Sequence, residues 1–133
     1  MAERRRRHVD RLLPVLAADL ARSVHAGATL VTSLEDAGAA LDEPLRGDVE
    51  RVRDAISRGV PVERSLRDWA ERATNPGVTL LVTAARLGHS HGGDLGVALD
   101  AAAVSLLDRV EVDDEARALA SQARSSAMVL VAL

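Results

Sequence analysis

The sequence predicts an all-α fold, a single compact bundle of about six antiparallel helices with a long C-terminal helix. Apolar residues recur at spacings of three and four positions almost throughout the 133 residues. The chain has no phenylalanine or tyrosine and one tryptophan, so leucine, valine and alanine must build the core, which suits closely packed helices. No segment alternates apolar and polar residues as a half-buried strand does. A chain of this length is typical of one domain and needs no disulfide or metal to fold.

The first two helices are predicted from apolar spacing and from their ends. One apolar face runs over residues 9–24, with Pro14 near the helix start, where its missing N–H does little harm, and Gly27 closing the helix. Thr29 is expected to cap a second, shorter helix that runs to about Leu41. The acid- and proline-containing stretch that follows is expected to break the chain.

The remaining helices are separated by glycine and proline. A third helix is expected over residues 45–56 and is stopped by Gly59. The fourth begins at Pro61, in the first-turn position that proline favours, and the fifth covers residues 76–87. A last helix begins at Asp94 and continues without a break to the chain end. Short connections of this kind favour antiparallel neighbours.

The glycine-rich stretch LGHSHGG, residues 87–93, is the first candidate site. His89, His91 and Asp94 could converge on a divalent metal ion. However, two histidines on a loop are a weak metal signal, and no second ligand cluster or HExxH pattern supports them. A phosphate-binding loop is disfavoured because the chain has no lysine and the preceding element is helical.

A structural reading of the same stretch explains more of its residues. Gly88 is expected to end the fifth helix in a left-handed conformation, and Gly92 and Gly93 permit the chain reversal. Asp94 is a favourable N-cap for the last helix. We therefore interpret Gly88, Gly92, Gly93 and Asp94 as a structural turn, with no catalytic or cofactor-binding residue assigned anywhere in the chain.

An acidic turn in the last helix is the second candidate. Four carboxylates and one arginine lie beyond the regular apolar stripe of this helix, so the segment should project from the bundle or pack against a partner. A helix turn of this kind usually faces solvent or docks a protein rather than carrying acid–base chemistry. The docking residues proposed from sequence are Glu111, Asp113, Asp114, Glu115 and Arg117.

Charge and composition exclude several classes of function. The net charge of −3 and the near absence of aromatic residues disfavour nucleic-acid binding. The dense basic run, Arg4–Arg7, is interpreted as part of a solvated lead-in over residues 1–8, with a membrane-surface signal as the alternative. Because there is no cysteine, thiolate zinc sites and thiol redox chemistry are excluded.

Several stretches, in this order, resemble the cytoplasmic F domain of type II secretion systems, especially its tight-adherence (Tad/Flp) pilus branch. They are LARSVHAG at residues 20–27, SRGVPVERSLRDWAER at 57–72 and LLVTAARLGHSHGGDLGVALD at 80–100. The final ALASQARSSAMVLVAL, residues 118–133, is similar to the last helix of that family where it enters the membrane. Each stretch is degenerate, but their order and spacing are fairly specific, and the resemblance covers nearly the whole chain.

The resemblance implies a non-catalytic platform protein of the bacterial inner membrane, with this domain on the cytoplasmic side. It would couple an assembly ATPase to the extraction and polymerisation of pilin subunits. The implied partners are that ATPase, a second platform protein, pilin subunits and the membrane, with a homodimer also open. The corresponding division is a lead-in at 1–8, the F domain at 9–126 and the start of a transmembrane helix at 127–133.

Two alternatives to the secretion platform remain. The first is a cytosolic helical adaptor that shares the same helix breakers. The second is a metal-dependent hydrolase that uses His89, His91 and Asp94. Residues 127–133 are all apolar, but a bilayer-spanning helix needs about 20 such residues. The membrane assignment therefore predicts a further apolar stretch encoded soon after Leu133.

Overall fold

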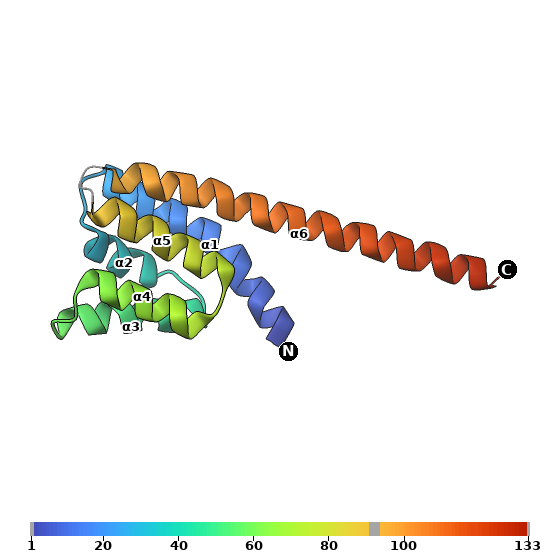
Figure 1. The fold of residues 1–133 in the computed structure, drawn as a ribbon, viewed down its shortest axis with the longest axis horizontal. Helices are drawn as coiled ribbons and strands as arrows, with labels where there is room; N and C mark the ends of the chain where they lie inside the picture. The colour runs from blue at the N-terminus through green and yellow to red at the C-terminus, as the bar shows by residue number, and fades with distance from the viewer. Residues whose placement is uncertain (1, 91–93, 133) are drawn as a thin grey trace.

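The computed structural model describes residues 2–90 and 94–132 and forms an all-α bundle over them (Figure 1). This confirms the predicted fold class, including the long C-terminal helix. Consecutive helices reverse direction along the chain in Figure 1, as expected for an antiparallel bundle. The helices are α1 (Ala2–His25), α2 (Leu30–Gly38), α3 (Leu45–Ser57), α4 (Val62–Ala73), α5 (Pro76–Ser90) and α6 (Leu95–Ala132).

The bundle is organised around α1, which packs against α2, α5 and α6. The helices α1, α5 and α6 form one group, and α2, α3 and α4 cover its lower side in Figure 1. Buried side chains come from every helix, with Trp69 of α4 as the largest of them. Burying each leucine contributes about 1.5–3 kcal/mol, so an aliphatic core of this kind can hold the bundle together without aromatic clusters.

The first helix is longer than the sequence indicated. It begins at Ala2, so the prediction that Pro14 lies near a helix start is wrong, because this proline is buried in the middle of α1. Pro14 cannot donate a backbone hydrogen bond to the Asp10 carbonyl, and prolines bend helices at such points. The first turns of α1 do leave the line of the rest of the helix in Figure 1. Tertiary packing of Pro14 and its neighbours therefore outweighs the missing bond.

Glycines occur in the structure for two different reasons. Gly27 and Gly59 follow helix ends with positive φ angles of 103° and 96°, as expected for helix termination. Gly88 was expected to end α5 in the same way, and this prediction is wrong, because α5 continues to Ser90 with Gly88 buried inside it. A Cβ atom at Gly88 would lie 2.7 Å from the Cα of Leu95. Glycine at this position lets α5 and α6 approach closely.

The other helix ends follow the predictions with small shifts. The Thr29 hydroxyl accepts a hydrogen bond from the Thr32 N–H at 3.1 Å, so Thr29 caps α2 as expected. This helix ends at Gly38 rather than near Leu41. The Asp94 carbonyl accepts the Ala98 N–H at 2.9 Å, the backbone pattern of a residue that starts a helix.

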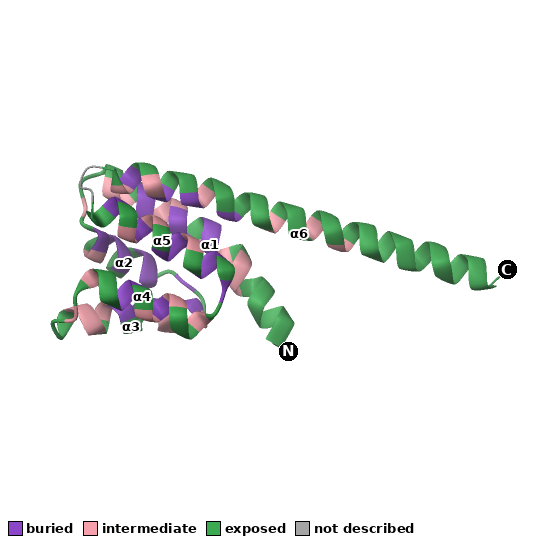
Figure 2. Cartoon of the chain, viewed as in Figure 1, coloured by how far each residue is buried: buried purple, intermediate pink, exposed green. Residues whose placement is uncertain are grey.

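The C-terminal helix leaves the bundle about a third of the way along its length. Leu106 is its last buried residue, and none of residues 107–132 is buried (Figure 2). We call this segment, residues 107–132, the shaft. At 1.5 Å per residue its 26 residues extend for about 39 Å. The shaft extends away from the bundle in Figure 1.

Candidate functional site

Opposite charges meet where the shaft passes the first turns of α1. Arg11 pairs with Asp114 at 2.7 Å, and Arg117 pairs with Asp113 at 2.9 Å and with Glu3 at 4.0 Å. We call these five residues the charged junction. All of these side chains are partly exposed, and ion pairs in such positions contribute about 0.2–1 kcal/mol each. The charged junction therefore adds little stability, and its main effect is to fix the direction in which α6 leaves the bundle.

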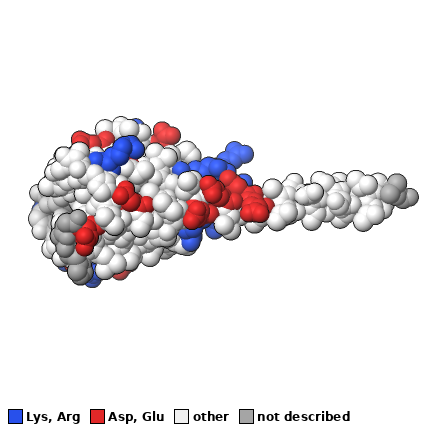
Figure 3. Space-filling view, turned by 90° about the horizontal axis from the view of Figure 1, so that it is seen from above, with Lys and Arg blue, Asp and Glu red and all other residues white. Residues whose placement is uncertain are grey.

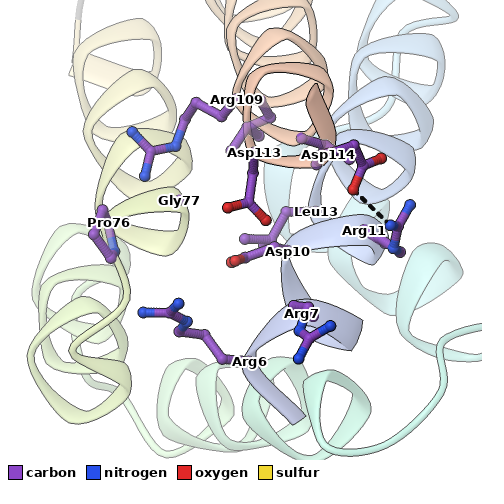
Figure 4. Close-up of a pocket in the computed structure, with 12 residues that line it drawn as sticks. Arg6, Arg7, Asp10, Arg11, Leu13, Pro76, Gly77, Arg109, Asp113 and Asp114 are labelled. Atoms are coloured by element: carbon purple, nitrogen blue, oxygen red, sulfur yellow. Dashed lines mark hydrogen bonds and ion pairs between the residues drawn. The ribbon is translucent and has the colours of Figure 1, made fainter. Parts of the chain in front are cut away.

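A small cavity of about 170 Å³ lies beside the charged junction, between α1, α5 and α6 (Figure 4). The carboxylates of Asp10 and Asp113 face one another in this view, and the guanidinium groups of Arg6 and Arg109 lie on its left side. Asp10 also accepts a hydrogen bond from the Asn75 amide at 3.0 Å. The carboxylates of the cavity thus lie between arginines on both sides, which suits a polar joint between three helices.

The structure divides the predicted docking residues into two sets. Asp113, Asp114 and Arg117 point toward α1 and take part in the charged junction. Glu111 and Glu115 are exposed and form no ion pair within the described residues. The two sets occupy different faces because successive residues of a helix are rotated by about 100°. Only Glu111 and Glu115 are left free to meet a partner.

The candidate metal ligands are only partly described. His89 is exposed in the last turn of α5, and Asp94 is exposed directly before α6. His91, Gly92 and Gly93 lie outside the described residues. Over residues 2–90 and 94–132, no group of three or more histidine, aspartate and glutamate side chains could hold a metal ion. The metal hypothesis, which needs His91, therefore stays a prediction.

A hydrogen-bonded ion pair joins α4 to α5. Arg86 donates a hydrogen bond to the carboxylate of Glu63 at 2.9 Å, and Arg67 lies 3.7 Å from the same oxygen. The hydrogen bond and the charge of Arg86 lower the pKa of Glu63 below its usual value, with smaller contributions from Arg67 and His89. The carboxylate of Glu63 is therefore charged at neutral pH and ties α4 to α5.

Sequence reasoning missed a contact that fastens the end of α1 to the start of α6. The His25 Nε2 atom lies 2.7 Å from a carboxylate oxygen of Asp100. The imidazole ring also covers Gly96, where an added Cβ would lie 2.6 Å from the ring carbon Cε1. Gly96 and Asp100 are four residues apart and so share one helix face. That spacing, together with a histidine at the end of the first helix, was the sequence feature from which this contact could have been predicted.

A second feature that sequence reasoning missed is a wide groove of about 1170 Å³. It lies between the first turns of α1, the start of α3 and the junction of α4 with α5. Its basic side chains are Arg4, Arg5, Arg6, His8 and Arg72. The arginine run in the sequence was visible, but Arg72 comes from a distant helix. We call this feature the basic groove.

The apolar end of α6 stands apart from the bundle. The large side chains of residues 128–131 are between 60% and 88% exposed. None of the helices, as far as residues 2–90 and 94–132 define them, has the length and apolarity that a membrane crossing requires. The predicted transmembrane start at 127–133 thus corresponds to the last turns of the shaft, with Leu133 outside the described residues.

Comparison with known proteins identifies the family. No curated protein and no solved structure matches the chain. A family model described as "Type II secretion system (T2SS), protein F" matches residues 16–133. The match covers α2 to α6 completely and the second half of α1. Because it extends over most of the sequence, the chain belongs to the type II secretion system protein F family.

Proposed function

We propose that this chain is a non-catalytic platform component of a type II secretion or Tad/Flp-like pilus system. In this role it couples an assembly ATPase to the extraction and polymerisation of pilin subunits. The family match over residues 16–133 carries the proposal. Its partners are the ATPase, a second platform protein and pilin subunits, and the described part of the domain acts through its surface.

The proposed location is the bacterial inner membrane, with the bundle on the cytoplasmic side. The shape of α6 supports this placement, because its exposed shaft of about 39 Å ends in apolar residues. The part of α6 before this apolar end carries arginines, and arginine is favoured on the cytoplasmic side of a membrane. The bundle would then stand clear of the bilayer at the end of a helical stalk.

Cell fractionation of the product of the complete gene tests this location. We expect the protein to sediment with the inner membrane and to resist extraction by high salt. We also expect protease added to inverted membrane vesicles to cleave the bundle, since it faces the cytoplasm. A gene that ends at Leu133, together with a freely soluble product in cells, would contradict both the location and the secretion role.

The outward carboxylates of α6 are the proposed docking surface of the platform. Glu111 and Glu115 are exposed and have no ion partner within residues 2–90 and 94–132. Interfaces of this kind depend on salt, because exposed charges are screened over about 8–10 Å at ordinary ionic strength. Replacing both glutamates by arginine should weaken the binding of protein partners at low salt while the bundle still folds. Unchanged binding of every partner would remove this surface from the proposal.

A further inference from the structure

The basic groove gathers positive charge that nothing in the described chain neutralises. Arg4, Arg5 and Arg72 are exposed and take part in no ion pair over residues 2–90 and 94–132, whereas Arg6 also lines the neighbouring cavity that holds Asp10 and Asp113. Among the described residues, Asp48 is the only carboxylate that lines the groove, and it is already paired with Arg51 at 3.1 Å. Like charges that converge in this way repel each other unless an anionic group lies between them. The groove therefore favours an acidic occupant.

The groove also offers apolar surface between its arginines. The half-buried Val9, Pro44 and Ala73 line it together with the basic side chains. A simple anion would use the charges and leave this apolar surface uncovered. A segment that carries both carboxylates and aliphatic side chains would use both. The volume of about 1170 Å³ is comparable to that of about ten residues of an α-helix, taken as a cylinder about 10 Å wide and 15 Å long.

The same chain presents a helix face with these properties. On α6, at about 100° per residue, one narrow face carries three carboxylates and two large aliphatic side chains. Val112 and Leu119 on this face are 65% and 60% exposed. We call this face the acidic ridge; it consists of Asp108, Glu111, Val112, Glu115 and Leu119. Figure 3 shows carboxylates gathered where α6 leaves the bundle.

The acidic ridge cannot occupy the basic groove of its own molecule. Asp113, Asp114 and Arg117 hold the opposite face of α6 against α1, so the ridge points away from the first turns of α1 that form the groove. Rotating α6 to reverse this would break the charged junction. The ridge and the groove are therefore complementary surfaces that only two different molecules can bring together.

We propose that the acidic ridge of one copy of this chain docks in the basic groove of a second copy. The glutamates of the ridge meet Arg4, Arg5 and Arg72, and Val112 and Leu119 cover the apolar surface between them. The inference rests on the docking role given above to Glu111 and Glu115 but not on the membrane location. A contact of about ten residues is small compared with a stable interface, so the association is weak and depends on salt.

Charge reversal on the two surfaces tests the docking. One variant carries Glu111→Arg and Glu115→Arg on the ridge, and a second carries Arg4→Glu and Arg5→Glu in the groove. A matched control, Glu35→Arg with Asp36→Arg, reverses two exposed carboxylates of α2 that lie on neither surface. Sedimentation equilibrium measures the molar mass of each full chain at low salt over a series of protein concentrations. Circular dichroism verifies that each variant is folded.

We expect the unmodified chain and the control to self-associate at low salt and to become monomeric at about 1 M salt, where the Debye length is about 3 Å. Each reversed variant alone should be monomeric, because its substituted side chains then face groups of the same charge on the partner surface, and the net attraction between ridge and groove is removed. A chain with all four ridge and groove substitutions should associate again. An equimolar mixture of the two reversed variants should also associate.

Three results would overturn the proposal. The first is a folded, unmodified chain that stays monomeric at every concentration at low salt. The second is loss of association in the α2 control as well as in the ridge variant. The third is an unmodified chain that stays monomeric but binds phosphatidylglycerol vesicles through Arg4 and Arg5, which would make a lipid surface the occupant. None of these results bears on membrane fractionation, so the platform role stands or falls separately.

Discussion

At the residue scale, the Glu63–Arg86 pair predicts a specific pH dependence. Because the folded-state pKa of Glu63 lies below its ordinary value of 4.5, the pair stabilises the fold above that pH. The stabilisation is lost as the pH falls through the lowered pKa. Arg86→Ala should raise the pKa of the Glu63 carboxyl toward 4.5, as measured by carbon-13 NMR of the side chain. Arg67→Ala should raise it less, and an unchanged pKa in Arg86→Ala would contradict the assignment.

A second prediction at this scale concerns the close contact at Gly88. Gly88→Ala places a Cβ atom 2.7 Å from the Cα of Leu95, so one of the two helices must move. Overpacking of this kind costs about 1–3 kcal/mol, more than the gain in helix propensity of about 0.5–1 kcal/mol. Urea denaturation should show a net loss of stability.

Gly47→Ala is the matched control for Gly88→Ala. Gly47 is also inside a helix, but its new Cβ would meet only the flexible end of Glu43, at 3.2 Å. The stability of this variant should be unchanged or slightly higher. A Gly88→Ala chain as stable as the Gly47→Ala chain would mean that α5 and α6 separate at little cost.

The two histidines of the glycine-rich stretch give a third prediction. His89 is exposed, and over residues 2–90 and 94–132 no group of three or more histidine, aspartate and glutamate side chains could hold a metal ion. The double variant His89→Ala and His91→Ala should keep the melting temperature of the unmodified chain. Elemental analysis of both proteins should find no stoichiometric metal. A bound metal that disappears in the variant, with a large fall in melting temperature, would restore the metal hypothesis.

At the scale of the helices, the part of the shaft beyond the charged junction should contribute little to the stability of the bundle. No residue of α6 beyond Leu106 is buried, and exposed positions usually change stability by less than about 0.5 kcal/mol. A chain ending at Ala120 keeps the whole charged junction, so its melting temperature should match that of residues 1–133. Hydrogen exchange should be fast over residues 121–132 and slow in α1. A large loss of stability would mean that the end of α6 contacts the bundle in solution.

The same scale shows why most helices could be predicted and some of their ends could not. Apolar spacing of three and four residues is a local signal, and it located all six helices of the described chain. The roles of Pro14 and Gly88 were predicted wrongly because each residue type has two possible structural roles that the local sequence does not distinguish. Proline can start a helix or be tolerated inside it, and glycine can end a helix or let two helices touch. Which role each residue has depends on the helices packed against it, and the local sequence does not show which helices those are.

At the scale of the whole molecule, the surfaces were harder to predict than the core. The acidic turn was visible as a run of charges, but its division into an inner and an outer face depends on which side of α6 meets α1. The basic groove joins Arg4, Arg5 and Arg6 to Arg72, which are distant in the chain. The family could be predicted because the sequence contains its degenerate stretches in the expected order. The family match over residues 16–133 confirms this prediction.

The continuous geometry of α6 has a mechanical consequence. A straight helix anchored in the bundle at one end behaves as a lever whose fulcrum is the charged junction. A tilt of about 10° there would displace the tip of the helix, about 23 Å beyond Arg117, by about 4 Å, most of one helix turn. Exposed ion pairs such as Arg11–Asp114 are weak enough to break and re-form during such a swing. Small rotations of the bundle relative to α6 can thus move the far end of the helix by several ångströms.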